Sequence, residues 1–480
     1  MLGVWNKDKM GASSNAELLV AFHRFGWGIR PGVNDLRAIG NDPRGFVAAE
    51  LAKTSPLAPA DSGLQASSEL IVVLEAQRER EKQARATPPS MAAPPAADST
   101  GNRAKPPPTP LTPLQQRVHA EAQARLQLAH KSGCGFVERL VTFWSNHFCV
   151  AASRGQQVQI LAGAYEREAI RPHVLGKLGG MLKAAEQHPA MLLYLENQGS
   201  IGPNSQIGLK RKRGLNENLA REILELHTLG VGGGYTQADV TSLARMLTGW
   251  AMAGMDGRLG KPGLFAYDAA AHEPGAQVML GKTYADVGRG QAEKALQDLA
   301  RKPATATHIA TKFVRHFVAD AAPPALVARL AKTLRETDGD LRSLAAALIA
   351  SDEAWKAPLT KIRSPYEFWI AAGRLLNPEP EPARHTINVL NQMGQPLWNP
   401  PGPDGFADTN AAWANPNALK TRFDMVSNLA RAHRARDPRE LLEQGFAGLA
   451  SSATRTAVAR AESSQQGLAL LLMSPEFLRR

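Results

Sequence analysis

Apolar residues recur every three or four positions along most of the 480-residue chain, and this spacing favours helices almost throughout. In residues 135–148 the spacing places aromatic and aliphatic side chains on one helix face, and residues 216–229 repeat the pattern. A strand-like pattern occurs only in 264–267 and 277–280, from which we expect at most one short β-hairpin. The sequence therefore predicts an all-α fold, a large multi-helix bundle, and argues against a parallel-sheet nucleotide-binding fold.

Several helix ends are marked by residues that satisfy or replace free backbone groups. Thr236 and Asp239 have the spacing of a capping box at a helix N-terminus. Pro189 suits the first turn of a helix, where its missing N–H is not needed. Gly230 suits the left-handed conformation in which many helices end. These signals predict that helices begin near residues 189 and 236 and that another ends just before residue 230.

One segment breaks the helical pattern. Thr87–Pro113 holds nine of the 33 prolines within 27 residues. Each proline lacks the backbone N–H and restricts its predecessor, so neither helix nor sheet can form there. We interpret this segment as a disordered Pro-rich insertion between two helices. The predicted organisation is an N-terminal helical part of the main domain in residues 1–86, the insertion in 87–113, and the main helical domain in 114–480.

The chain carries a net charge of +12, which by itself suggests nucleic acid or another anionic partner. The excess is local. Residues 77–132 hold nine Lys and Arg against four acids, and residues 206–214 hold four cations, Lys210–Arg213, and no acid. Because this basic run has no interleaved aromatic residues, we interpret it as a solvated loop rather than a phosphate-binding one. We therefore expect no nucleic-acid partner.

The cysteines and the apolar runs bear on the compartment. Cys134 and Cys149 do not form a Cys-x-x-Cys pair, so we expect two free buried thiols, with a disulfide between them as the alternative. The first residues lack a basic stretch followed by an apolar run, and no segment has about 18 consecutive apolar residues. We expect no membrane span and a cytoplasmic protein, with export as the alternative if the true start lies upstream.

Standard catalytic and nucleotide-binding motifs do not occur in the sequence, including the Walker loop, the Gly-x-Gly-x-x-Gly turn, the His-Glu-x-x-His helix and the Gly-x-Ser-x-Gly elbow. Instead, separated histidines lie beside apolar helix faces in the middle of the chain. Imidazole suits zinc, iron or manganese and titrates near neutrality, so these side chains could bind a divalent metal ion or carry protons. The predicted ligands are His147, His188, His227 and His272.

A second set of candidates shares the predicted helix 216–229. Asn218, Glu222 and Glu225 recur at i, i+4 and i+7 and form one polar stripe. Arg221 can pair with Glu217 or Glu225, each one turn away. We predict a catalytic role for all four, with the two glutamates as metal ligands or a general base and Arg221 orienting a carboxylate. The structural alternative is that the histidines are hydrogen-bonded core residues and the charged residues form an ion-pair network.

The sequence resembles the bacterial "domain of unknown function 1800" family in segments spread over essentially the whole chain, with the Pro-rich insertion as the least typical part. The resemblance implies a mostly helical bacterial protein of unassigned activity. It also implies a gene that often lies beside one for a sulfatase-like "domain of unknown function 1501" protein. The shared motifs include Asn146 and the candidate residues named above. They lie in Phe22–Gly32, Phe136–Phe148, Glu166–Leu178, His188–Asn197, Gly214–Val240, Ala244–Trp250, His272–Gly281, His308–Asp320, Leu390–Phe406 and Gln466–Arg480.

Two hypotheses from different classes follow. The first is an enzyme with a central His/Glu/Asn site that could bind a divalent metal ion. The alternative is a non-catalytic helical scaffold or partner of the sulfatase-like protein, in which the polar residues are structural ion pairs.

Overall fold

The computed structural model describes residues 12–34, 36–52, 63–86, 111–211, 214–376, 379–446 and 450–480. Within these ranges the chain forms 25 α-helices and only four short strands, which confirms the predicted all-α class. The predicted Pro-rich insertion falls mainly on residues 87–110, which lie outside the described residues. The division into residues 1–86, 87–113 and 114–480 stays a prediction.

The elements follow one another in three stretches. The first contains α1 (Ala12–Val20), η2 (Ala21–Phe25), α2 (Leu36–Asn41), α3 (Pro43–Ala49), η3 (Glu50–Ala52), α4 (Ser67–Ala86), α5 (Pro113–Lys131), α6 (Phe136–His147), η4 (Ala152–Arg154), α7 (Gln156–Tyr165), η5 (Glu166–Ile170), η6 (Arg171–His173), α8 (Leu178–Gln187), α9 (Pro189–Tyr194) and η7 (Asn197–Gly199). The second contains α10 (Gln206–Arg211), α11 (Asn218–Glu222), η8 (Ile223–His227), α12 (Gln237–Leu247), β1 (Trp250–Met252), β2 (Phe265–Tyr267), β3 (Gln277–Met279), β4 (Lys282–Tyr284), α13 (Arg289–Ala300), α14 (Pro303–Phe317), α15 (Pro324–Glu336), α16 (Leu341–Ala350) and α17 (Asp352–Lys356). The third contains α18 (Pro365–Leu376), α19 (Ala383–Gln392), α20 (Asn410–Trp413), α21 (Pro416–Ala432), α22 (Pro438–Phe446), α23 (Ser452–Ala459), α24 (Ser464–Leu472) and α25 (Pro475–Leu478).

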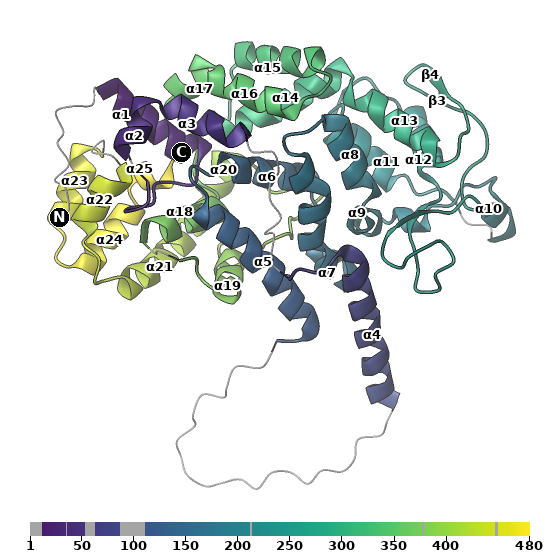
Figure 1. Ribbon diagram of the computed structural model, residues 1–480, viewed down its shortest axis with the longest axis horizontal. Helices are drawn as coiled ribbons and strands as arrows, with labels where there is room; N and C mark the ends of the chain where they lie inside the picture. The colour runs from purple at the N-terminus through teal and green to yellow at the C-terminus, as the bar shows by residue number, and fades with distance from the viewer. Residues whose placement is uncertain are drawn as a thin grey trace, which may run out of the picture.

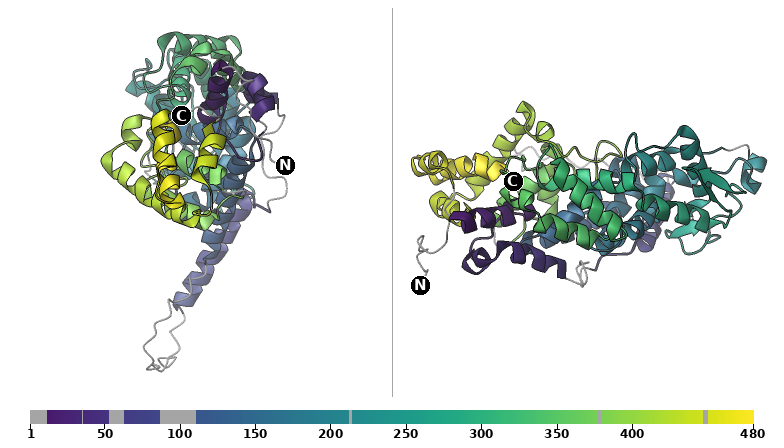
Figure 2. Two further views of the ribbon diagram at one scale, coloured as in Figure 1. Left: turned by 90° about the vertical axis from the view of Figure 1, so that its left-hand side faces the viewer. Right: turned by 90° about the horizontal axis from the view of Figure 1, so that it is seen from above.

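The helices wrap around a central group. Figure 1 shows α6 and α7 in the middle of the molecule, the green helices α14–α17 above them, and the yellow C-terminal helices on the left. Helices α4 and α5 both pack on α7 and extend away from the body in the same direction, as the side view in Figure 2 also shows. The N-terminal helices are not separate from this body, because Arg24 and His23 bond to backbone oxygens of Ala354 and Gly445.

The predicted helix ends agree with the structure. Thr236 caps α12, and it forms the reciprocal capping box with Asp239. Pro189 is the first residue of α9, and the side chain of His188 before it accepts a hydrogen bond from Ala190 N–H. Gly230 adopts a φ of 84° after the turn of η8, in the left-handed region that favours glycine. These boundaries could be predicted because the capping chemistry is local in sequence.

The strands correct the predicted hairpin. Residues 264–267 and 277–280 do not pair with each other. Instead β2 pairs with β1, and β3 pairs with β4, in two separate antiparallel pairs. The β3–β4 turn is tight because Gly281 takes a positive φ of 74° directly after Met279 and Leu280. Each strand pairs with a strand that is its neighbour in the sequence. The described chain therefore has two small antiparallel sheets where one hairpin was expected.

The buried side chains form two large apolar clusters. The larger one runs through α6–α9 and α11–α16, and the smaller one through α18, α19 and α21–α25 together with part of α5. Trp398, in the segment between α19 and α20, packs against both clusters. Cys134 and Cys149 are free and buried, as predicted. The junction between the two clusters is therefore the place where residues from distant parts of the chain meet.

Buried charged side chains close several helix ends near this junction. The Glu50 carboxylate accepts hydrogen bonds from the N–H groups of Cys134, Gly135 and Val137 at the start of α6. Arg374 donates to the carbonyl oxygen of Gly28 and to four carbonyl oxygens at and beyond the C-terminus of α5, on Ala129, His130, Ser132 and Gly133. The free groups of a helix end must be satisfied when they are buried, so these residues fix where α5 and α6 meet.

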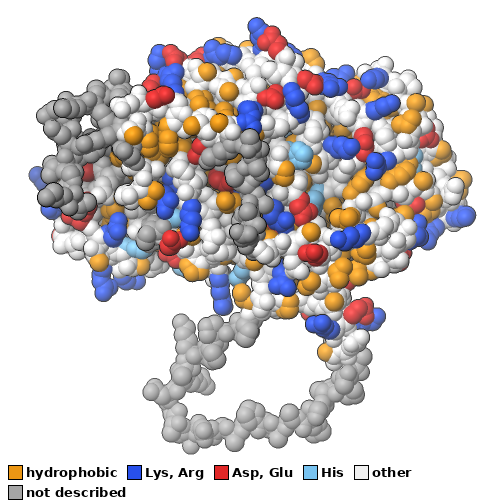
Figure 3. Space-filling model, in the orientation of Figure 1, with side chains coloured by type: hydrophobic (Ala, Val, Ile, Leu, Met, Phe, Trp, Pro, Cys, Tyr) orange, Lys and Arg blue, Asp and Glu red, His pale blue; other side chains and the backbone are white. Residues whose placement is uncertain are grey.

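The surface agrees with the prediction that the excess positive charge is confined to a few segments. Basic and acidic side chains are interspersed over the face drawn in Figure 3. Lys210 and Arg211 lie in helix α10 rather than in the loop that was expected, and both are exposed; the rest of the basic run lies outside the described residues. Among the described residues, no helix is long and apolar enough to cross a membrane.

Candidate functional site

A cavity of about 330 Å³ opens at the junction of the two apolar clusters, and we call it the central pocket. Its walls come from α5–α7, from α14, from the start of α18, from the segment 395–413 and from Arg480. Aromatic rings cover much of the wall, while charged groups gather at three places on it. A volume of this size lies at the lower end of the range for small-molecule sites, which often form where two structural units meet.

Helices α6 and α14 form the first polar side of the pocket. Phe143 of α6 lies beside Phe313 and His316 of α14, with ring centroids 5.2 and 5.4 Å apart. One turn further along α6, His147 lies 6.3 Å from His308, which is two turns earlier in α14. The two helices are thus paired in opposite directions. Lys312 is midway between His308 and His316, so it faces the stretch of α6 that carries His147.

Lys312 lines the central pocket and is half-buried. In the part of the chain that the structure describes, its ammonium group has no hydrogen bond and no ion pair. Burial lowers the pKa of Lys312, while Cys149, Asp404 and Asp408 act in the opposite direction. An ammonium group that is partly withdrawn from water without a counter-ion is energetically costly, and such a group normally has a partner.

His147 is the second unusual group on this side, and it is only 1% exposed. Its Nε2 lies 3.2 Å from the carbonyl oxygen of His227, which can only accept, so Nε2 carries the proton. The other ring nitrogen, Nδ1, is then an acceptor, and it has no hydrogen-bond partner and is shielded from bulk solvent. Burial and the nearby Lys312 hold the pKa of His147 well below its usual value, so the ring is neutral.

The second polar side of the pocket is a compensated ion-pair group around Glu166, in the π-helical turn η5. Its carboxylate lies 3.0 Å from Arg125 and 3.2 Å from Arg171. It also accepts hydrogen bonds from Ser145 Oγ and Trp398 Nε1. Burial would raise the pKa of Glu166, but Arg125 and Arg171 outweigh burial and lower it. This wall is fully partnered and offers no free charge to a ligand.

A further charged network closes the pocket near α18. Glu367 lies 2.9 Å from Arg139 and 2.8 Å from Arg480, and all three side chains are 3% exposed or less. Asp408 accepts a hydrogen bond of 2.6 Å from His316 Nδ1 and pairs with Lys361 at 3.0 Å. Burial would raise the pKa of Asp408, but His316, Arg480 and Lys361 hold it well below its usual value. Each charge in this network has an opposite charge or a hydrogen bond.

The segment 395–413 covers the pocket and is attached to α6 by its backbone. Asn146 donates through Nδ2 to the carbonyl oxygen of Phe406 and accepts from Phe406 N–H through Oδ1. Gly405 approaches so closely that a Cβ there would lie 2.5 Å from the Asn146 carbonyl oxygen, and its φ is 83°. Trp398 has a positive φ of 52°, which is strained for a bulky residue. The strained conformation directs its indole N–H at Glu166.

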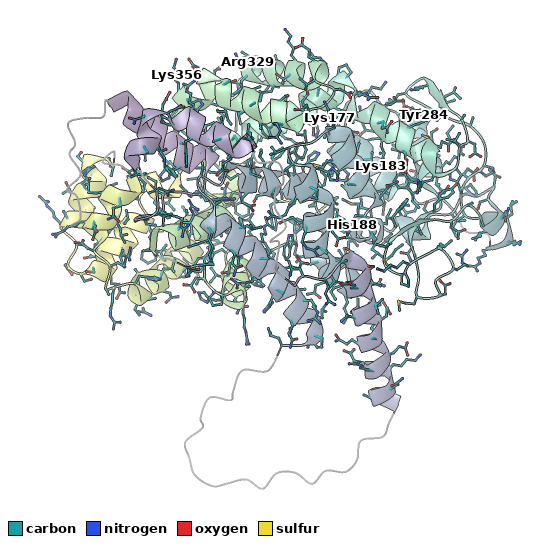
Figure 4. All side chains as sticks on the ribbon, in the orientation of Figure 1. Lys177, Lys183, His188, Tyr284, Arg329 and Lys356 are labelled. Carbon is teal, nitrogen blue, oxygen red and sulfur yellow. The ribbon has the colours of Figure 1, made fainter. Side chains whose placement is uncertain are left out.

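The four predicted metal ligands do not form one group. His147 lines the pocket, and His227 lies next to it with ring centroids 6.1 Å apart. Nδ1 of His227 lies 2.7 Å from Oε1 of the buried Glu186. His188 lies near the start of α4, where it contacts Glu168 and Ser67 and caps α9 (Figure 4). His272 bonds to the Thr248 carbonyl oxygen at 2.9 Å.

In the described part of the chain, no three His, Cys, Asp or Glu side chains are close enough together to hold a metal ion. The structure adds no support for a four-histidine metal site, which stays a prediction. The pocket brings only His147 of the four into its wall.

The predicted catalytic stripe lies on the surface side of α11 and η8. Asn218 is exposed, and Arg221 forms ion pairs with Glu217 at 3.2 Å and Glu225 at 3.5 Å, with all three side chains between 27% and 38% exposed. Glu222 is half-buried, and burial raises its pKa. The structure thus favours the ion-pair interpretation for Arg221 and Glu225, on the surface rather than in the core. None of the four lines the central pocket.

The pocket residue that motif reasoning missed is Lys312. A signal for it exists in the sequence, because His308, Lys312 and His316 follow one another at intervals of four and form a polar stripe on one face of α14. The residues across the pocket from Lys312, such as Trp398 and Asp408, belong to a Pro- and Gly-rich segment. Its sequence has no periodic pattern from which its conformation could be predicted.

The buried neutral histidines predict how stability depends on pH. Burial lowers the pKa of His23 to about 3 and that of His316 to about 4, from 6.5. The unfolded chain therefore binds protons at a higher pH than the folded one, so stability is complete above pH 6.5 and falls as the pH drops towards 4. We expect each ring to contribute up to about 1.4 kcal/mol per pH unit.

Urea unfolding between pH 7.5 and 4.5 checks this prediction. The variant His23→Gln removes one titrating ring, so its free energy of unfolding should depend less steeply on pH than that of the native chain. A free energy of unfolding that is constant between pH 6.5 and 5 would contradict the expected neutral state of these histidines.

The fold and the central pocket together define a predominantly helical protein with a partly charged cavity of small-molecule size. A family model described as "Protein of unknown function (DUF1800)" matches residues 20–479, which is nearly the whole chain. The chain therefore belongs to this family, as the sequence motifs predicted. No curated protein and no solved structure matches the chain.

Proposed function

We propose that the central pocket binds a small organic anion with an apolar body, and that Lys312 contacts the negatively charged group of this ligand. The observation that carries the proposal is the half-buried Lys312 ammonium group, which lines the pocket without a partner among the described residues. Of the carboxylates in the pocket wall, Glu166, Glu367 and Asp408 are already paired with arginine, lysine or histidine. Asp404 acts on Lys312 electrostatically but forms no ion pair with it. A carboxylate from outside would supply the missing counter-ion.

The remaining wall supports an apolar body for the ligand. The rings of Phe143, Tyr366, Trp398, Phe406 and Trp413 all line the pocket. Arg125 lies over the rings of Tyr366 and Trp398, at 4.7 and 5.7 Å from their centroids, which holds both rings in place. Aromatic walls with a few placed polar groups are typical of pockets that bind small organic molecules. The best match is therefore an aromatic or similarly apolar monocarboxylate.

This proposal is narrower than the two hypotheses from the sequence. It belongs with the first, because it places a small-molecule site in the middle of the chain, but it replaces the His/Glu/Asn centre with Lys312 and the aromatic wall. The divalent metal ion and the sulfatase-like partner stay predictions, and neither is needed for the proposed site.

Calorimetric titration with phenylacetate and its neutral isostere phenylacetamide tests the proposal. We expect phenylacetate to bind about tenfold or more tightly than the amide, because only the acid supplies a counter-ion for Lys312. The variant Lys312→Met should remove this preference. It should fold at least as stably as the native chain, since it removes an unpaired charge from a partly apolar site.

Lys332→Met is the matched control, because Lys332 lies on the next helix, α15, with a side chain that is 65% exposed. This variant should keep the preference for phenylacetate. Equal affinity for acid and amide in the native chain, or no binding of phenylacetate up to about 10 mM, would overturn the proposal.

A further inference from the structure

We infer that the ligand of the central pocket carries a hydroxyl group next to its carboxylate, as an aromatic 2-hydroxy acid does, and that His147 Nδ1 accepts the hydrogen bond from this hydroxyl. The inference rests on the proposed function, since it assumes that Lys312 holds the carboxylate. It adds a second recognition group and names the class of ligand.

The state of His147 determines what the ligand must bring. Nε2–H is committed to the carbonyl oxygen of His227, which fixes the proton on that nitrogen. Nδ1 can then only accept, and no described donor reaches it although the side chain is 1% exposed. Buried polar atoms without a partner are rare in folded proteins and are often explained by a missing ligand group or water. Because Nδ1 is an acceptor, the missing group must be a donor.

Lys312 and His147 line the same pocket, and they are near enough for the charge of Lys312 to lower the pKa of His147. The ring of His147 lies 6.3 Å from His308, and Phe143, one turn earlier in α6, lies 5.4 Å from His316. Lys312 is between these two histidines on α14, and both Lys312 and His147 line the same pocket. In the proposed complex, the ligand carboxylate binds Lys312, and the carbon next to the carboxylate lies on the side of His147.

The charge of Lys312 favours a hydroxyl over an ammonium group as the donor. A 2-amino acid would bring a second cation next to Lys312. Asp404 lines the pocket without a described ion pair, but its charge acts on Lys312 and Cys149. The groups whose charges act on His147 itself are Lys312, His227 and His308, and all three charges lower its pKa. Like charges at such short range oppose binding. A hydroxyl is neutral and satisfies Nδ1 without this repulsion.

Competition between mandelate, phenylacetate and phenylglycine tests the inference by calorimetry on the full chain. Mandelate and phenylacetate differ only by the hydroxyl, and a site that has a buried polar group to satisfy rejects the analogue that lacks it. We expect mandelate to bind about tenfold or more tightly than phenylacetate, and phenylglycine to bind more weakly than phenylacetate. The methyl ether of mandelate, 2-methoxy-2-phenylacetate, keeps the oxygen but has no donor, so it should bind no better than phenylacetate.

The variant His147→Phe should reduce the mandelate affinity to that of phenylacetate while phenylacetate still binds, which shows that the variant is folded. His308→Phe is the matched control, because His308 lies on the same face of α14 but outside the pocket wall, and it should keep the preference for mandelate. If His147→Phe does not fold, the comparison of mandelate with its methyl ether on the native chain decides.

Each outcome separates this inference from the proposed function. Equal binding of mandelate and phenylacetate, or equal binding of mandelate and its ether, would overturn the hydroxyl and leave the carboxylate site in place. Tighter binding of phenylglycine than of mandelate would overturn it in favour of an amino acid. Loss of the preference for acid over amide would instead overturn the proposed function itself.

Discussion

Replacing Glu367 with glutamine is expected to lower the free energy of unfolding by about 3 to 5 kcal/mol, although the two side chains have nearly the same shape. Glu367 is the carboxylate between Arg139 and Arg480, at 2.9 and 2.8 Å. Without its charge, the almost fully buried Arg139 loses its ion pair, and the neighbouring buried Arg480 keeps only the longer pair with Asp408 at 3.6 Å. Urea unfolding of the native chain and of Glu367→Gln at neutral pH measures the difference.

The charge of Glu367 also predicts how the free energy of unfolding changes at acidic pH. Burial would raise the pKa of Glu367, but Arg480 and Arg139 outweigh burial and lower it to about 2. Because the folded pKa is below the unfolded value of 4.5, the stabilisation is complete above pH 4.5 and is lost as the pH falls towards 2. The difference in stability between the native chain and Glu367→Gln should therefore shrink below pH 4.5.

Glu353→Gln is the matched control, since Glu353 also pairs with an arginine but on the surface, where its side chain is 39% exposed. A surface pair of this kind contributes at most about 1 kcal/mol. A Glu367→Gln variant that is no less stable than Glu353→Gln would show that the buried network does not depend on this charge.

Replacing Arg374 with methionine is expected to destabilise the protein by at least about 3 kcal/mol, because each buried carbonyl that loses its donor costs about 1 to 3 kcal/mol. Arg374 is 1% exposed and donates to five carbonyl oxygens, four of them at or just beyond the end of α5. Methionine fills similar space but offers no donor. Thermal and urea unfolding measure the loss.

Arg431→Met is the control for this variant, because Arg431 is an exposed residue near the end of helix α21. It should change the free energy of unfolding by no more than about 0.5 kcal/mol. If Arg374→Met were as stable as Arg431→Met, ordered water would have to satisfy these carbonyls in place of the arginine.

The helices could be predicted from the sequence because their signals are local. The apolar spacing in 135–148, the capping box of Thr236 and the turn at Gly230 each depend on residues within a few positions of one another. The pairing of the strands was harder to predict, because the pattern of a strand indicates which face is buried but does not determine which strand it pairs with. The helical class is confirmed, and the single expected hairpin is replaced by two.

The candidate site could be predicted only in part. His147 was identified because a histidine on an apolar face is conspicuous, and it does line the pocket. Arg221 and Glu225 have the same polar spacing whether their stripe faces a pocket or water, so spacing alone could not decide between catalysis and surface ion pairs. Lys312 stands out as a site residue only because it lacks a counter-ion. This is a property of its surroundings in the fold and not of any sequence motif.

The position of Arg480 in the pocket wall has a consequence for synthesis in the cell. Helices α6 and α14 can pair as soon as residue 317 has left the ribosome, yet the pocket still lacks the segment 395–413 and the guanidinium group of Arg480. A nascent chain therefore exposes a half-built cavity while more than 150 further residues are translated, and Glu367, once made, can pair only with Arg139 until Arg480 arrives. Ligand binding should accordingly begin only after residue 480 has docked, and a truncated translation product should not bind.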